Sequence, residues 1–340
     1  MMPIFMIGTQ RSGSNLLRLM LNQLPEIAAP HPPHILQRFM PLVPSYGDLR
    51  VDANFFQLVE DVCRLVELNP VPWDGVELNR AGIVRGCRER SLVSVQAAVY
   101  DVYAGIHHAT TWCCKSLANI NYVPEIEAYF KKPRYIYLFR DGRDVAVSFR
   151  KAVVGEKHFY HIAKEWVATQ KLALALGLEI DRDRFMRVRY EDLIHNPEGT
   201  ARDICDFLGV PFRGSMLNYY STEEAKRASS SSDLWNNVVS PVMRDNSGKF
   251  LREASERDIR IFESVAGPVL DALRYDRHFV KQGKEQVYAE YDIKTFDAEN
   301  SRIKEEICKH IDPADQNRRD QQTSLLHMIR NRQVSLTLTT

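Results

Sequence analysis

Two short segments hold the residues best suited to chemistry on an anionic ligand, and the first of them is a glycine loop. Gly8 and Gly13 have the spacing G-x-x-x-x-G, which places backbone N–H groups and a helix N-terminus around an anion. The lysine and the Ser/Thr that usually follow such a loop are replaced by Ser14 and Asn15. Arg11, inside the loop, can supply the missing positive charge. The loop therefore predicts an anion site that works without a metal ion, although the same spacing also fits a purely structural turn.

The second segment pairs an arginine with a serine eight residues later. Arg140 follows an apolar run, and Ser148 lies about two turns into the helix that comes next. A phosphate could lie between the guanidinium, the hydroxyl and the helix N-terminus. Alternatively, Arg140 and Arg143 pair with Asp141 and Asp144 on a solvated turn. Two anion sites at neighbouring strand ends would fit one ligand with phosphates at both ends.

Four short apolar runs are predicted to form the strands that position these residues. The runs lie at 4–7, 110–114, 135–139 and 185–190, and helical patterns follow the first, third and fourth of them. Strands that alternate with helices indicate a parallel sheet whose two faces are covered by helices. The predicted fold class is therefore α/β.

The rest of the chain is predicted to be helical, apart from two loops. We expect a main domain over 1–280 with a helical insertion at about 50–108, followed by a charged helical extension over 281–340. This extension would either pack on the body or mediate self-association. Prolines predict a constrained loop at 30–34, and serines predict a second loop at 229–232.

In three segments the chain resembles the sulfotransferases that use 3′-phosphoadenosine 5′-phosphosulfate (PAPS) as donor. The segments are GTQRSGSNLLRLML at 8–21, LFRDGRDVAVSFRK at 138–151 and RVRYEDLIHNPEGTARDICDFLGVPF at 187–212. They occur in the family's order, and with NSGKF at 246–250 the resemblance covers most of 1–275. The R-S-G-S loop is more similar to the bacterial and tyrosylprotein-type members than to the cytosolic phenol and steroid enzymes. The resemblance implies a central parallel sheet flanked by helices, in the P-loop NTPase-like sulfotransferase fold.

The resemblance also implies a binding role for each residue that matches a family motif. The glycine loop would hold the 5′-phosphosulfate, and Arg140 and Ser148 would bind the 3′-phosphate. Tyr190 would lie near the adenine, and Lys249 would belong to a basic loop that closes over the 3′-phosphate. A core tyrosine and a surface lysine are the structural alternatives for these last two. The loop residues concerned are Gln10, Arg11, Ser12, Gly13, Ser14 and Asn15.

Sulfuryl transfer needs positive charge near the departing phosphate oxygen and a base for the acceptor hydroxyl. Arg11 can supply the charge, and Lys115 matches a lysine that many family members place beside the leaving group, although it could be an ordinary strand-end lysine. The K-T-H histidine of the cytosolic enzymes is absent, and so is the glutamate that other members carry after the first helix. His31 or His34 is the predicted replacement, since a histidine titrates near neutrality. The sequence does not separate the two.

We therefore predict an enzyme that transfers the sulfuryl group of PAPS to a hydroxyl or amine of a small or neutral acceptor and releases PAP, the desulfated donor. The insertion at 50–108 is expected to form part of the acceptor pocket. Two alternatives stay open. A P-loop kinase-like nucleotide enzyme is disfavoured by Ser14, which replaces the lysine. A non-catalytic PAP-binding protein would be favoured if neither histidine acts as a base.

Composition limits the partners. The 45 Lys plus Arg and 44 Asp plus Glu give a formal charge of +1, which excludes a polybasic nucleic-acid binder and disfavours a large polyanionic acceptor. No apolar window approaches the roughly 20 residues of a spanning helix and no secretory signal is seen, so we expect a cytoplasmic protein. The 6 cysteines and 10 histidines show no metal-ligand spacing, so no metal is expected. A homo-oligomer could form through the extension.

Overall fold

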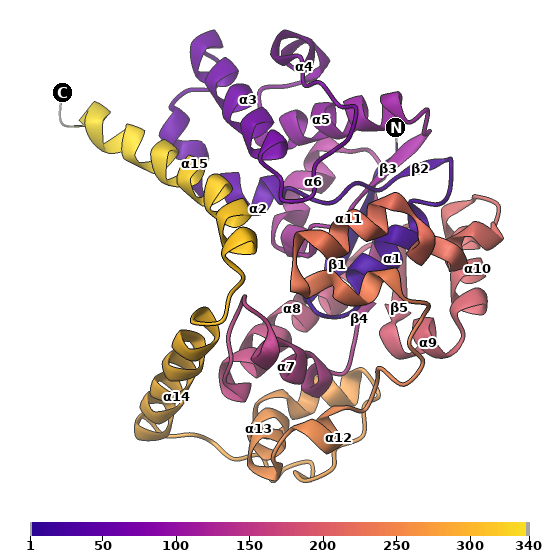
Figure 1. Cartoon of the computed structure of the whole chain (residues 1–340), viewed down its shortest axis with the longest axis vertical. Helices are drawn as coiled ribbons and strands as arrows, with labels where there is room; N and C mark the ends of the chain where they lie inside the picture. The colour runs from indigo at the N-terminus through magenta and orange to yellow at the C-terminus, as the bar shows by residue number, and fades with distance from the viewer. Residues whose placement is uncertain (1, 338–340) are drawn as a thin grey trace.

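A sheet of five parallel strands runs through the middle of the molecule in the computed structural model, which describes residues 2–337 apart from the side chains of 233 and 333–337. The strand order is β2-β3-β1-β4-β5 (Figure 1). The predicted α/β fold with a parallel sheet is confirmed. Only β2 was missed, because a run of two residues carries no recognisable pattern. The strands are β1 Ile4–Gly8, β2 Ile27–Ala28, β3 Thr111–Cys114, β4 Arg134–Phe139 and β5 Phe185–Arg189.

Alternate residues of the central strand face two separate cores. Phe5 and Ile7 of β1 pack into one hydrophobic cluster, and Ile4 and Met6 pack into the other. Successive strand side chains point to opposite faces, so each face needs its own layer of helices. The first core is covered mainly by α2 (Ile35–Phe39), α3 (Asp52–Glu67), α5 (Leu92–Ile106), α6 (Val123–Tyr129), α7 (Gly142–Lys151), α8 (Phe159–Glu179) and α13 (Glu256–Ala272), and the second by α1 (Ser14–Leu21), α9 (Tyr190–His195), α10 (Pro197–Leu208) and α11 (Glu223–Ser231).

The segment at 50–108 is helical, as its pattern predicts. It consists of α3, α4 (Arg80–Gly86) and α5, and it packs on the first core at one end of the molecule (Figure 1). The remaining short helices are α12 (Phe250–Glu253) and the 3₁₀ helices η1 (Met40–Tyr46), η2 (Leu117–Tyr122), η3 (Gly214–Ser221) and η4 (Asp233–Val239).

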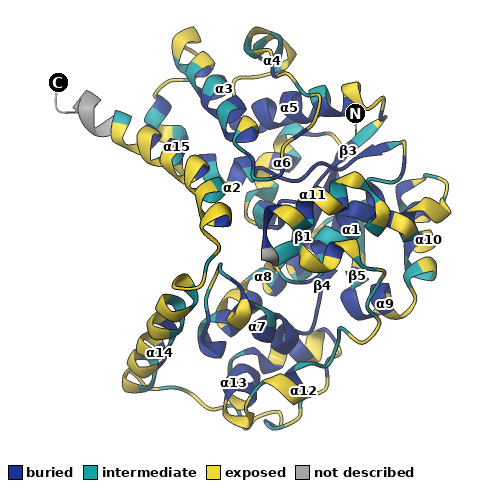
Figure 2. Cartoon of the chain, viewed as in Figure 1, coloured by how far each residue is buried: buried dark blue, intermediate teal, exposed yellow. Residues whose placement is uncertain are grey.

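Two long helices end the described chain and form an arch along one side of the body (Figure 1). Asn300 of α14 (Glu290–Cys308) accepts hydrogen bonds from the backbone N–H groups of Lys157 and His158 at 2.7 and 3.0 Å. Arg332 of α15 (Pro313–Thr337) forms an ion pair with the fully buried Asp61 of α3 at 2.8 Å. The extension therefore packs on the body, while its outward faces are exposed (Figure 2).

The prediction of a loop at 229–232 is wrong. Helix α11 continues to Ser231, and Ala225 and Ala228 bury its inner face. Thr222 caps the helix by accepting a hydrogen bond from the N–H of Ala225 at 3.2 Å. A run of serines has low helix propensity, but here tertiary packing and the cap outweigh that preference.

Candidate active site

The carboxyl ends of the strands meet a cavity of about 1270 Å³ at one edge of the sheet. The loop after β1, Lys115 after β3, Arg140 after β4 and Tyr190 after β5 all reach it, as expected for a parallel sheet whose strands end together. Ser12 is fully buried behind the wall. The other predicted site residues all line the cavity: Gln10, Arg11, Gly13, Ser14, Asn15, His31, His34, Lys115, Arg140, Ser148, Tyr190 and Lys249.

Close packing around Gly8 and Gly13 fixes the conformation of the glycine loop. Gly8 has φ 139°, and a Cβ built on it would lie 2.1 Å from the carbonyl oxygen of Leu138. Gly13, which precedes α1, has φ 86°, and its Cβ would lie 2.3 Å from the ring of Tyr190. Both positions therefore require glycine, because any side chain would be strained and would clash.

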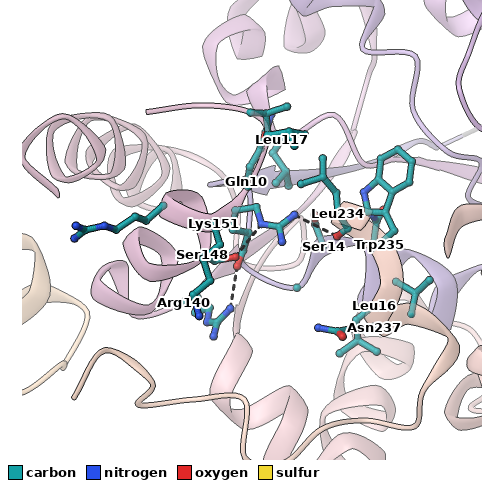
Figure 3. A pocket seen from close by; sticks show the side chains of 18 of the residues that line it. Gln10, Ser14, Leu16, Leu117, Arg140, Ser148, Lys151, Leu234, Trp235 and Asn237 are labelled. Carbon is teal, nitrogen blue, oxygen red and sulfur yellow. Dashed lines mark hydrogen bonds between the residues drawn. The ribbon is translucent and has the colours of Figure 1, made fainter. Parts of the chain in front are cut away.

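Arg11 extends from this loop across the cavity. Its Nε donates to Ser148 Oγ at 2.9 Å, and a terminal nitrogen donates to the carbonyl oxygen of Leu234 at 3.3 Å. Figure 3 shows Gln10, Arg140 and Ser148 converging from the loop, the end of β4 and α7. Burial, and then the charge of Arg140, lower the pKa of Arg11 from its ordinary value. The two segments that the sequence predicts to bind an anion thus line one cavity.

Arg140 connects the glycine loop with the segment before α12. Its terminal nitrogens donate to the carbonyl oxygens of Arg11 at 3.1 Å and Asn246 at 2.8 Å. Its guanidinium lies over the ring of Tyr190, 4.5 Å from the centroid. A carboxylate oxygen of Asp144 lies 3.5 Å from a terminal nitrogen of Arg140 and forms an ion pair with it. The ion pair that the sequence offered as the alternative is therefore present, but it is buried instead of lying on a solvated turn. Anion binding by Arg140 stays a prediction.

The segment 246–250 is fixed over this arginine by residues that sequence analysis did not assign to the site. Asp144 accepts hydrogen bonds from the backbone N–H groups of Gly248 at 2.8 Å and Phe250 at 3.0 Å. Asn246 donates to the hydroxyl of Tyr190 at 2.6 Å. The spacing of Arg140 and Asp144 by four residues was a visible signal for an ion pair, but nothing local indicated that Asp144 also binds a distant loop.

His31 lies in the proline-rich loop with its ring nitrogen Nε2 buried and without a hydrogen-bond partner among the described residues. Its backbone oxygen accepts hydrogen bonds from Trp73 Nε1 at 2.7 Å and Asn69 Nδ2 at 2.9 Å, which fix the loop. The ring meets Trp235 edge-on, with centroids 4.6 Å apart. This histidine is held rigidly and has a free nitrogen at the cavity wall.

His34 precedes α2 in the left-handed backbone region, with φ 61°. Histidine is among the non-glycine residues found there more often, yet the conformation still costs free energy. Its Nδ1 is also buried and unpartnered among the described residues. A strained backbone beside a cavity often marks a functional position. The unpartnered nitrogens do not decide between His31 and His34, because each histidine has one.

Positive charge accumulates between these histidines and the glycine loop. Burial, followed by the charge of Lys115, lowers the pKa of His31 well below its usual value and that of His34 to about 3. Burial and the charges of Arg18 and Arg11 lower the pKa of Lys115 to about 7. The Lys115 side chain forms no hydrogen bond or ion pair with the described residues. An anion in this cavity would relieve these unfavourable contacts.

Unpartnered polar atoms test whether the site fits a polyanionic nucleotide. Ser12 Oγ and Arg140 Nε are buried and have no hydrogen-bond partner among the described residues. Such atoms are rare in folded proteins and point to an absent ligand or water. Arg140 lines the cavity and its Nε is a donor, as an anionic ligand requires, whereas Ser12 lies behind the wall. In the described part of the chain, no cluster of three or more His, Cys, Asp or Glu side chains could hold a metal ion.

The family follows from the match of a family model, described as "Sulfotransferase family", to residues 3–214. This match spans more than half of the chain and includes the glycine loop, Lys115, Arg140 and Ser148. The chain belongs to the sulfotransferase family.

Curated relatives of this sulfotransferase include protein-tyrosine sulfotransferase A of Caenorhabditis elegans, which is 22% identical over 286 residues, or 80% of this chain and 67% of the worm protein. The protein-tyrosine sulfotransferase of Drosophila melanogaster is 22% identical over 80% of this chain, which spans only 51% of the fly protein. Among solved structures, the sulfotransferase domains of a Synechococcus olefin synthase and of the curacin biosynthetic pathway both align with a TM-score of 0.56. They share 22% and 20% identity, and each alignment covers 81% of this chain and at least 95% of the domain. These structures support the fold.

The outer walls of the cavity in this sulfotransferase come from segments that sequence analysis did not place there. Arg18 of α1 is fully buried and forms an ion pair with Glu224 of α11, which holds α11 and the following Leu234 and Trp235 beside the cavity. Residues of α2, η1, α14 and α15 form the far wall. No described residue of the insertion at 50–108 lines this cavity. Trp73 and Tyr103 of the insertion line a smaller pocket that also includes His31, so its expected contribution to an acceptor pocket stays a prediction.

Proposed function

We propose that this sulfotransferase transfers the sulfuryl group of PAPS to a hydroxyl or amine of an acceptor, with His31 or His34 as general base and without a metal ion. One observation carries the proposal. Arg11, Lys115 and Arg140 meet at the carboxyl edge of the sheet with buried, unpartnered donor atoms and with two unpartnered histidine nitrogens in the same cavity. Such an arrangement suits an anionic donor on one side and an acceptor proton on the other.

The donor would lie along the carboxyl ends of β1 and β4. The backbone N–H groups of the glycine loop and the α1 N-terminus would bind its 5′-phosphosulfate, and Arg140 and Ser148 its 3′-phosphate. Tyr190, which lines the cavity and packs against Gly13 and Arg140, would lie near the adenine. The bound donor supplies an activated sulfuryl group whose leaving phosphate oxygen gains negative charge as the bond breaks.

Arg11 and Lys115 would stabilise that charge. Both lie in a low-dielectric site, where a fixed positive charge has a strong effect on a developing negative one. Lys115, with its pKa of about 7, is close to half protonated at neutral pH in the free protein. An anionic ligand would raise this pKa and hold the lysine in its charged form.

A histidine must be neutral to accept the acceptor proton, and the lowered pKa values of His31 and His34 keep both neutral at pH 7. A bound polyanion would raise these pKa values again and make the imidazole a stronger base. The unpartnered Nε2 of His31 and Nδ1 of His34 are the atoms that could take the proton.

Radiolabelled sulfuryl transfer from PAPS to a mixture of phenols, sugars and alcohols tests the reaction. His31→Gln and His34→Asn are the base variants, because asparagine tolerates the left-handed backbone of position 34. His108, exposed and also left-handed at φ 54°, provides the matched control His108→Asn. We expect one base variant to lose at least about 100-fold in kcat while PAP binding and the control stay unchanged. Full activity in both variants would exclude a histidine base.

Two alternatives are tested by ligand binding in the same samples. PAP binding without any sulfuryl transfer would indicate a non-catalytic PAP-binding protein. Tighter binding of ATP with Mg²⁺ than of PAP without metal would indicate a kinase-like enzyme and contradict the proposal.

The cellular setting also stays a prediction. No helix in the described part of the chain is long and apolar enough to cross a membrane. We keep the predictions of a cytoplasmic protein without a nucleic-acid partner, and of a homo-oligomer through the extension, which cell fractionation and sedimentation would test.

A further inference from the structure

The far wall of the cavity carries arginines that the donor site does not use. Arg38 projects from α2, and Arg319 and Arg330 project from α15. On α15 the three cavity-lining residues Arg319, Leu326 and Arg330 are spaced seven and four apart, so they lie on one face of the helix. The face toward α3 carries Leu325 and Ile329 instead. The extension therefore supplies a basic strip that faces the same cavity as the glycine loop.

Two of these arginines lack a partner. The side chains of Arg38 and Arg330 form no hydrogen bond or ion pair with any described residue. Arg319 forms an ion pair with Asp315 at 2.9 Å and donates to Ser232 Oγ at 2.7 Å. Burial, followed by the charge of Arg319, lowers the pKa of Arg38. A partly buried guanidinium beside another one is unfavourable unless an anion lies between or near them.

The charged residues that line the cavity show which cations have neither a carboxylate partner nor a place in the proposed donor site. Within the described residues, ten Lys and Arg side chains and three carboxylates line the cavity. Arg11, Lys115, Arg140 and Lys249 belong to the proposed donor site. Three others have carboxylate partners: Arg150 with Asp258, Lys151 with Glu253 and Arg302 with Glu306. Arg319 pairs with Asp315, so Arg38 and Arg330 are the two lining cations outside the proposed donor site that have no carboxylate partner among the described residues.

We propose that Arg38, with Arg319 beside it and Arg330 about three turns farther along α15, forms a second anion site that binds a carboxylate or phosphate ester on the acceptor. The inference rests on the proposed function, because it assumes that the other end of the cavity holds the donor. Guanidinium groups bind carboxylates and phosphates through paired hydrogen bonds, which makes arginine the suitable residue here. Leu326 and Pro41 add an apolar stretch of wall for the body of the acceptor. The acceptor class is therefore a small hydroxy acid or hydroxyalkyl phosphate, which replaces the neutral acceptor favoured by net charge.

Matched pairs of probes test this inference on the full-length protein saturated with PAP. Each pair consists of an acid and its uncharged analogue: hydroxyphenylacetate and its methyl ester, hydroxyhexanoate and its methyl ester, glucuronate and glucose, and glucose 6-phosphate and glucose. Binding is followed by calorimetry at fixed ionic strength. We expect at least one acid to bind about tenfold or more tightly than its uncharged analogue. The carboxylate and phosphate pairs then show which anion is preferred.

Arginine variants test whether the preference for the acid over its uncharged analogue depends on Arg38 and Arg330. The double variant Arg38→Gln/Arg330→Gln should lose the preference, Arg38→Lys/Arg330→Lys should keep part of it, and exposed Arg182→Gln should behave as wild type. PAP affinity, measured in the same variants, should not change. The inference is overturned if no acid binds more tightly than its analogue, if the double glutamine variant keeps the preference, or if it weakens PAP equally. Failure of the wild type to bind PAP would instead contradict the proposed function.

Discussion

The Nε of Arg11 donates a hydrogen bond to the Oγ of Ser148 at 2.9 Å, across 137 residues of sequence. The resemblance to known sulfotransferases assigns these residues to opposite ends of the donor. In the structure, they contact each other directly. If a donor binds as proposed, with Arg11 at one end and Ser148 at the other, it would exchange this hydrogen bond for bonds to its own oxygens.

Ser148→Ala removes one neutral hydrogen-bond donor from the 3′-phosphate side. We expect PAP affinity to fall about fivefold, or about 1 kcal/mol, because the serine is only one of several donors. Calorimetry measures this, and exposed Ser301→Ala on α14 is the control. An unchanged PAP affinity would mean that Ser148 only positions Arg11.

Arg140→Ala should have a larger effect than the serine variant. It removes a charged donor and also the group that fixes the carbonyl oxygens of Arg11 and Asn246. We expect a loss of about 2 to 3 kcal/mol in PAP binding, or roughly 30- to 150-fold. Exposed Arg202→Ala is the control. A loss no greater than that of the control would remove Arg140 from the donor site.

Lys115 should couple PAP binding to proton uptake. Its pKa of about 7 in the free protein rises when an anion binds, so at pH 8 the lysine takes up a proton on binding. PAP affinity is then greatest below pH 7 and decreases, by at most about tenfold per pH unit, as the pH rises above 7.

Calorimetry at pH 8 in two buffers of different ionisation enthalpy measures this uptake directly. The phosphates of PAP are fully ionised at this pH, since their second pKa is about 6. Lys115→Met should bind PAP without the proton. Equal uptake in wild type and variant would assign the proton to another group.

Gly13→Ala should destabilise the fold through a clash with Tyr190. The added Cβ would lie 2.3 Å from the tyrosine ring, at a backbone φ of 86° that alanine adopts poorly. We expect a decrease of about 2 to 4 kcal/mol in the free energy of unfolding, measured in urea. Gly214→Ala, with no atom within 4 Å of its Cβ, should change it little. In a Tyr190→Ala background, Gly13→Ala should cost less than in wild type, and an equal cost in both backgrounds would exclude the clash.

Arg332→Ala should loosen α15 from the body. Asp61 is fully buried and would keep only Tyr46 and Gln57 as partners. We expect a loss of about 1 to 2 kcal/mol in unfolding free energy, since Arg332 is partly exposed, together with faster hydrogen exchange in α15. Arg302→Ala, which breaks an exposed pair on α14, is the control. Unchanged exchange in α15 would show that Leu325 and Ile329 dock the helix by themselves.

The sequence could identify the residues proposed for the donor, which line one cavity, because their signals are local. Gly8, Gly13 and Arg11 lie in one loop, and Arg140 and Ser148 lie on one strand-helix junction, so each group forms a pattern within about ten residues. Parallel topology then brings the strand ends to one edge. Local apolar runs likewise predicted the strands, except for the two residues of β2.

The acceptor side could not be predicted because its contacts are distant in sequence. Arg332 and Asp61 are 271 residues apart, and neither has a neighbour that indicates the pairing. The same difficulty arises in the proposed donor site, where Asn246 and Tyr190 are 56 residues apart. Net charge carries no information about this wall, since a total of +1 averages over a cavity in which cations outnumber carboxylates among the described residues.

The cavity is lined by two separate sets of elements, the loops after the strands and the helices α2 and α15. This division affects how the protein can evolve. The groups proposed for the donor follow buried strands, where substitutions disturb both cores. Arg38 and Arg330 lie on helix faces where they contribute to neither core, so they can be replaced at little cost in stability. A lineage could therefore change its acceptor through a few substitutions on α2 and α15 while the donor chemistry stays constant.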